Sequence, residues 1–192
     1  MLHIDTPLSR QIQDEVARRV GSPLAALLRE NALVHATIEL GRCFSCQALS
    51  ANDVLAGGKP LRACTWSPHM WHHQILFDRE AKAFARTVFR HADTSSFEIS
   101  EVVYSSLAAE IEQALSWLEE HADRDYSLRL LLAPAFYIAA LWLSHHDEES
   151  IVIAKKPEGY DLLVKEKLYT SDEFLQTLAE HNPRASAGLE LR

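Results

Sequence analysis

The sequence predicts an α+β fold, in which a helical N-terminal half packs on a small antiparallel sheet centred on residues 128–155. Three observations lead to this prediction. Apolar residues with helix-like spacing are concentrated before residue 122, and the most strand-like segments come after it. The third observation is an almost continuous apolar run from Leu128 to Leu143, which only Arg129 and Pro134 interrupt. The interrupted run is too short to span a membrane.

The apolar run can be interpreted as strands or as a helix. Pro134 lacks the N–H that a helix interior needs, and the β-branched residues from Ile151 to Ile153 follow a polar segment. These features favour strands at 128–133 and 135–143, a turn at 144–150 and a returning strand at 151–155. The alternative is a helix over 135–143 with Pro134 in its first turn, because Ala and Leu are good helix formers.

We expect a single domain over residues 1–180, followed by a loose tail at 181–192. The domain divides into a helical hairpin at 7–30, a mixed and mainly helical part at 31–122, and the sheet with a C-terminal helix at 123–180. Spacing and capping patterns place the individual elements. They are a strand at 33–40, helices at 46–55, 78–91 and 96–121, an ordered loop at 61–74, a strand at 160–169, and a last helix capped by Thr170 and Glu173.

Composition limits the kinds of function. The 192 residues include 27 acidic and 19 basic side chains, for a net charge of -8, which argues against a general nucleic-acid binder. The N-terminal residues MLHIDTPLSRQ lack the charged and apolar regions of a signal peptide, so we expect a cytoplasmic protein without a membrane partner. In that compartment the three cysteines remain thiols.

The segment from Gly41 to Ala51 is the most specific local pattern. It places Cys43 and Cys46 immediately before an expected helix, and a helix N-terminus lowers the pKa of a nearby thiol. The order of glycine, cysteine, serine and cysteine at Gly41, Cys43, Ser45 and Cys46 resembles the nucleophile segment of papain-like cysteine peptidases. This resemblance implies that Cys46 is a nucleophile.

A cysteine nucleophile needs a base and a group that orients the base. His145 is a candidate base, with His146 as an equal alternative, and Asp161 is a candidate orienting carboxylate. Together with Cys46, these residues would form the triad of a cysteine-dependent hydrolase or acyltransferase.

The same cysteines suit a second hypothesis, a structural zinc site. Cys43 and Cys46 have a chelating spacing, and Cys64 and His69 can supply two further ligands of a tetrahedral site. The protein would then be a zinc-stabilised binding module. Outside this alternative we expect no cofactor.

A group of aromatic and histidine side chains gathers in the expected loop. Tryptophan offers a large apolar area with one polar atom, which suits the centre of a protein interface. We therefore predict an accessory or regulatory protein that acts by protein–protein interaction, with a partner or with itself. The predicted binding surface consists of Trp66, His69, Trp71, His72 and His73.

Overall fold

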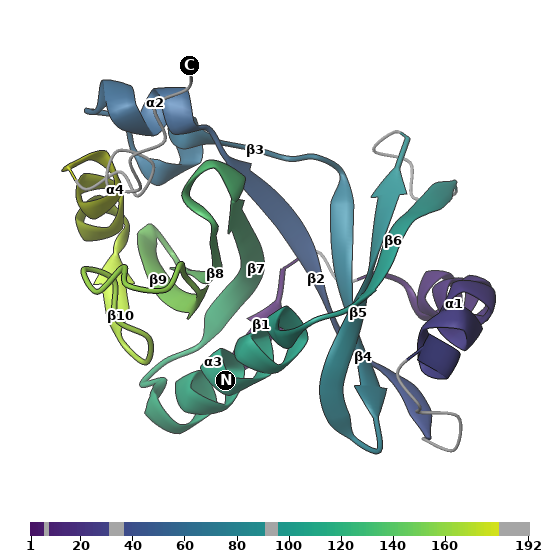
Figure 1. Ribbon diagram of the computed structural model, residues 1–192. Helices are drawn as coiled ribbons and strands as arrows, with labels where there is room; N and C mark the ends of the chain where they lie inside the picture. Colours follow the sequence, from purple (N-terminus) through teal and green to yellow (C-terminus); the bar gives the residue numbers. More distant parts are fainter. Residues whose placement is uncertain (6–7, 31–36, 91–95, 181–192) are drawn as a thin grey trace.

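The computed structural model describes residues 1–5, 8–30, 37–90 and 96–180 (Figure 1). In chain order the strands and helices are β1 (Leu2–Ile4), α1 (Arg10–Glu30), β2 (Ile38–Leu49), α2 (Ala51–Ala56), the 3-10 helix η1 (Leu61–Cys64), β3 (Thr65–Trp66), β4 (Met70–Phe77), β5 (Glu80–Phe89), β6 (Phe97–Tyr104), α3 (Ser106–His121), β7 (Tyr126–Ala133), the 3-10 helix η2 (Pro134–Phe136), β8 (Ile138–His145), β9 (Glu148–Lys155), β10 (Leu168–Thr170) and α4 (Ser171–Glu180). Within these residues, strands β3 to β6 and strands β8 to β10 follow one another directly, and helices lie between the other strands.

The strands form one mixed sheet in the order β10-β9-β8-β7-β2-β4-β5-β6, with β1 paired to β7 and β3 paired to β2. The pairing of β7 with β2 joins the two halves of this sheet, which are β10-β9-β8-β7 and β2-β4-β5-β6. The first half of β7 pairs in parallel with β1, and its second half pairs in parallel with Cys46–Ala48 of β2. The other described pairs are antiparallel.

Helix α3 lies on the inside of a bend in the sheet. It packs on both β5 and β9, although β8, β7, β2 and β4 lie between these two strands in the sheet. A single helix can contact both strands because the sheet curls around it (Figure 1). Ile111, Leu115 and Leu118 of α3 pack with apolar residues from both halves of the sheet.

The other helices cover the outer face of the bend. Val16, Val20 and Leu24 of α1 pack on β4, β5 and β6. Val54 of α2 and Phe174 of α4 pack on β7, β8 and β9. The sheet therefore separates three apolar clusters: an inner cluster around α3, an α1 cluster, and an α2–α4 cluster.

The prediction of a helical N-terminal half on a small antiparallel sheet is wrong. Six of the ten strands in the described part of the chain precede residue 122, and the sheet is mixed, since β7 has parallel neighbours. The main reason is that β4 and β5 are buried on both faces, between α1 and α3. A strand with two buried faces loses the alternation of apolar and polar residues that identifies strands in a sequence.

Several element predictions need the same correction. The helical hairpin at 7–30 is one helix, α1, which continues through Gly21 and Pro23 because Val16, Val20 and Leu24 stay buried along one side. The helix at 46–55 is the end of β2 and then α2, which Ser50 caps. The helix at 78–91 is β5, the helix at 96–121 is β6 followed by α3, the loop at 61–74 contains η1, β3 and most of β4, and the strand at 160–169 is reduced to β10.

Other predictions are confirmed. The apolar run forms strands β7 and β8, with η2 at Pro134, and β9 returns after a tight turn at His146 and Asp147. Thr170 and Glu173 cap α4 as predicted. The predicted strand at 33–40 overlaps β2 from Ile38 onward, and its first residues and the predicted tail lie outside the described residues.

Candidate functional site

A cleft opens where α3 begins. It is a cavity of about 400 Å³ between the first turn of α3, the η2 turn and the inner face of the sheet. Its volume lies in the range of small-ligand and side-chain pockets, roughly 300–1,000 Å³. The lining residues are Arg86, Leu107, Leu132, Pro134, Tyr137, Ile138, Ala139 and Lys155.

The sheet register explains the apolar floor of the cleft. Trp66 pairs with Ala48, Ala48 with Leu132, Leu132 with Ala139, and Ala139 with Lys155. Paired residues on neighbouring strands point to the same face of a sheet. Leu132 and Ala139 belong to the inner cluster, so this row crosses five strands on the face toward α3. Because α3 begins only at Ser106, the row is left partly uncovered.

Two exposed aromatic side chains belong to the cleft or to the same row of residues. Tyr137, which lines it, is 60% exposed and has a left-handed backbone with φ of 57°. Trp66, at the end of the row, is 57% exposed. Large apolar side chains this exposed are available for contact with another molecule.

Arg86 forms one wall of the cleft. Its Nη1 donates to Glu101 Oε1 at 2.5 Å, and its guanidinium lies 4.8 Å from the centroid of the Phe84 ring. The Nε atom is buried and has no hydrogen-bond partner among the described residues. This donor is therefore not exposed to the cleft, whereas 20% of the side chain remains exposed.

A buried polar cluster lies beside Arg86. His72 pairs with Arg86 across β4 and β5, stacks on Phe84 with ring centroids 4.6 Å apart, and is fully buried. Neither imidazole nitrogen has a hydrogen-bond partner in the described part of the chain. Burial, reinforced by the charge of Arg86 and by His73, lowers the pKa of His72 to about 3. Gln74, two residues along β4, donates to the Ala108 carbonyl of α3 at 3.4 Å.

A second cavity, of about 490 Å³, lies between α2 and α4. Its charged residues include Lys59 and Asp53, which pair with each other at 2.5 Å. Glu180 also lines it, and the chain beyond this residue lies outside the described residues. We assign no function to this cavity, although it is larger than the cleft.

The structure places Cys46 within β2 and not at a helix N-terminus. The side chain is 1% exposed, and its nearest polar contact is a 3.9 Å approach of Sγ to the Phe44 carbonyl. Burial raises the pKa of Cys46 to about 12, against the opposing charge of Arg86 and a hydrogen bond with the His72 backbone. At neutral pH this thiol is protonated.

The proposed partners of Cys46 lie elsewhere. Cys46 pairs with Leu130, which pairs with Leu141, and His145 lies four residues further along β8. The separation is about 13 Å along the strand and about 10 Å across the sheet. His146 occupies the adjoining turn, and Asp161 is exposed, with its carboxylate 3.6 Å from Lys156 Nζ. The structure does not bring the four residues together.

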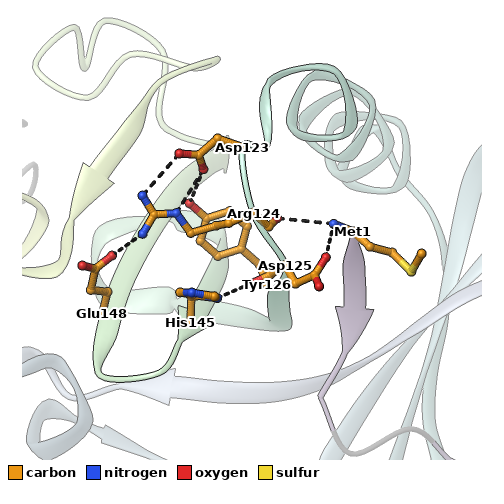
Figure 2. Close-up of polar contacts among 7 residues, drawn as sticks. All are labelled: Met1, Asp123, Arg124, Asp125, Tyr126, His145 and Glu148. Carbon is orange, nitrogen blue, oxygen red and sulfur yellow. Dashed lines mark hydrogen bonds and ion pairs between the residues drawn. The ribbon is translucent and has the colours of Figure 1, made fainter.

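His145 belongs instead to a surface polar network (Figure 2). Its Nδ1 lies 2.7 Å from the Asp125 carbonyl oxygen. The Asp125 carboxylate contacts the Met1 amino group at 2.5 Å. Arg124 lies in the segment that leads into β7. It forms ion pairs with Asp123 and with Glu148, the first residue of β9. This network ties the N-terminus and the β8–β9 turn to the start of β7.

The predicted zinc ligands are distributed over the whole sheet. Cys43 lies in the α1 cluster, Cys46 in the inner cluster and Cys64 in the α2–α4 cluster, while His69 is exposed. Within residues 1–5, 8–30, 37–90 and 96–180, no group of three or more His, Cys, Asp or Glu side chains could hold a metal ion. The four predicted ligands therefore do not converge on one point.

The predicted binding surface is divided by the sheet. Trp66 and His69 are exposed, and Trp71 is half-buried with its ring 4.7 Å from that of Phe89. His72 and His73 are buried, at 0% and 1% exposure. Only the first part of the group, and Trp66 above all, can therefore contact another molecule.

Sequence reasoning missed most of the cleft. Arg86 stood in a segment predicted as helix, Tyr137 and Lys155 were expected to be ordinary strand residues, and Leu107 stood in the middle of a predicted helix. Pro134 was the one available signal, since a proline inside an apolar run marks a turn.

Comparison with protein-family models, with curated proteins and with solved structures found no match. Among the described residues, no helix is long and apolar enough to cross a membrane.

Proposed function

We propose that this protein is an accessory or regulatory protein that binds a segment of a protein partner in the cleft. One observation supports the proposal most directly: α3 leaves part of the inner sheet face uncovered, and the exposed Tyr137 and Trp66 accompany the resulting apolar cavity. Tryptophan, tyrosine and arginine dominate the binding energy of protein interfaces. The cleft and its surroundings contain one of each.

The proposal includes a cytoplasmic location. The three cysteines are free thiols, which fits a reducing compartment. The hydrolase and zinc hypotheses have no converging side chains to support them, so we do not put either forward as a second function.

The test is selection of a random peptide library against the full chain, followed by measurement of the selected peptides on variants. Tyr137→Asn removes the ring and keeps a residue that tolerates a left-handed backbone, and Trp66→Thr keeps a strand former. Loss of an aromatic anchor costs about 1–4 kcal/mol, so each variant should weaken binding by roughly fivefold or more.

Ile38→Thr is the matched control, since Ile38 is an exposed apolar residue on the same strand as Ala48. It lies ten residues from Ala48 along β2, roughly 30 Å at the rise of a strand. Selected peptides that bind the Tyr137→Asn and Trp66→Thr variants as tightly as the native protein would contradict the proposal. A concentration-dependent dimer that Tyr137→Asn dissociates would identify a second copy of the chain as the occupant.

A further inference from the structure

The charges at the cleft are opposite to those of the chain as a whole. The chain has 27 acidic and 19 basic residues, a net charge of -8. Among the described residues, both charged side chains that line the cleft, Arg86 and Lys155, are nevertheless basic. They come from strands in different halves of the sheet, β5 and β9, and thus border the cavity on two sides.

Arg86 can accept a further carboxylate. Glu101 contacts Nη1, and the side chain keeps 20% of its surface exposed where it lines the cleft. A guanidinium carries five N–H groups in a planar fork, and two adjacent groups match the two oxygens of one carboxylate. The Phe84 ring beneath the guanidinium holds its plane in place.

Lys155 also keeps unused donors. Its Nζ donates to Ser106 Oγ at 3.2 Å and lies 3.6 Å from Glu110 Oε1. Glu110 is closer to Lys165, at 3.1 Å, so it neutralises Lys155 only in part. The Lys155 side chain is 40% exposed, and an ammonium group has three N–H donors.

Helix α3 adds a third source of positive potential. Leu107, in its first turn, lines the cleft, and this turn contains no acidic side chain. The N-terminal end of a helix carries a partial positive charge. Two cations and a helix N-terminus thus surround an apolar cavity.

We propose that the segment bound in the cleft is acidic: an apolar side chain fills the cavity, one flanking carboxylate binds Arg86, and the other binds Lys155. This inference rests on the proposed function and specifies the chemistry of the partner. The apolar side chain of the partner would pack on Leu132 and Ala139 in the floor of the cleft. The flanking carboxylates would accept hydrogen bonds from Arg86 and Lys155, which Glu101 and Glu110 neutralise only in part.

The experiment is a titration of the isotope-labelled full chain with three blocked tripeptides, followed by NMR. The probes are acetyl-Glu-Phe-Glu-amide, acetyl-Gln-Phe-Gln-amide and acetyl-Lys-Phe-Lys-amide. We expect the Glu peptide to shift the amide signals of Leu107, Leu132 and Ala139 and to bind about tenfold more tightly than the Gln peptide, because a desolvated charge-assisted hydrogen bond is roughly twice as strong as a neutral one. The Lys peptide should bind most weakly, and high salt should reduce the difference.

Lys155→Gln is the informative variant, because it removes an exposed charge without unpairing a buried one. It should weaken the Glu peptide by at least threefold and weaken the Gln peptide less, since a neutral amide loses only a neutral-acceptor hydrogen bond. Arg18→Gln is the matched control: it makes the same change of net charge on α1, which packs on the outer face of the sheet, and should alter neither peptide.

The outcomes separate the two proposals. Equal affinity of the Glu and Gln peptides at the cleft amides would overturn the acidic inference and leave the binding function in place. The same holds if Lys155→Gln and Arg18→Gln weaken the Glu peptide equally. Absence of any shift at the cleft amides with all three peptides would contradict both.

Discussion

The Cys46 thiol is buried on the face of β2 that packs against α3, and burial raises its pKa to about 12. We therefore expect iodoacetamide to label Cys46 at pH 8 more than a hundredfold more slowly than a free thiol with a pKa of about 8.5. Mass spectrometry of the labelled chain measures the rate at each cysteine. In urea all three cysteines should label at similar rates, which serves as the control. Fast labelling of folded Cys46 would contradict this structure and return attention to the hydrolase hypothesis.

His72 makes the stability of the fold depend on pH. Its pKa is about 3 in the folded chain and near 6.5 when unfolded, so below pH 6.5 the unfolded chain binds the extra proton. The contribution of neutral His72 to the free energy of unfolding is complete above pH 6.5, and it decreases as the pH falls toward 3. By this linkage, His72 alone should reduce the free energy of unfolding by about 2–3 kcal/mol between pH 7 and pH 4.5.

His72→Phe tests this expectation, since a phenyl ring can keep the stacking on Phe84 and cannot be protonated. Urea unfolding at the two pH values should show a smaller loss of stability in this variant than in the native protein. His69→Asn, at an exposed position with a left-handed backbone, should lose as much as the native protein. Equal losses in all three proteins would show that His72 is not held neutral by burial.

At the scale of the element, α4 depends on its capping box. The Glu173 backbone N–H donates to Thr170 Oγ1 at 3.2 Å, and the Thr170 N–H donates to Glu173 Oε2 at 3.0 Å. Thr170→Ala should lower the free energy of unfolding by about 1 kcal/mol, because it leaves a helix N–H without its acceptor. Chemical denaturation measures the change.

Two further variants make this test specific. Glu173→Ala combined with Thr170→Ala should cost less than the sum of the single changes, since the two side chains act as a unit. Gln176→Ala, which removes an exposed hydrogen bond to Glu180, should change stability little. Additive effects of the two capping substitutions would contradict the box.

The elements differ in how well the sequence predicts them, and the reasons are physical. The α4 cap is a local signal, since all its atoms lie within four residues of chain, and it is predicted correctly. β4 is not, because His72, His73 and Gln74 are buried polar residues that hide the apolar pattern of a strand. β5 was predicted as a helix because Ala83, Phe84 and Ala85 are buried on both of its faces.

The cleft could not be predicted for a different reason. Arg86, Tyr137 and Lys155 are far apart in the sequence, and only the curl of the sheet around α3 brings them to one cavity. Trp66 was identified by its residue type alone, and its place in the row with Leu132 depends on strand pairings that no local pattern encodes. Residue type thus identified Trp66 as a candidate, without the cavity near it.

At the scale of the whole molecule, α3 connects the two halves of the sheet. Leu115 is fully buried in the inner cluster, where α3 packs on β5 and on β9. Leu115→Ala should lower the free energy of unfolding by about 2–5 kcal/mol, the usual cost of such a cavity. Because both halves depend on the same helix, the protein should still unfold in a single transition.

Native-state hydrogen exchange distinguishes this coupling from local damage. In Leu115→Ala, the slowest amides of β5 and β9 should lose protection by the same free energy as global unfolding, although four strands lie between β5 and β9 in the sheet order. Ser116→Ala, at an exposed position of α3, should leave both strands protected. If only one strand loses protection, the two halves of the sheet unfold independently. The packing of α3 in the inner cluster would then not be what holds the two sides of the cleft together.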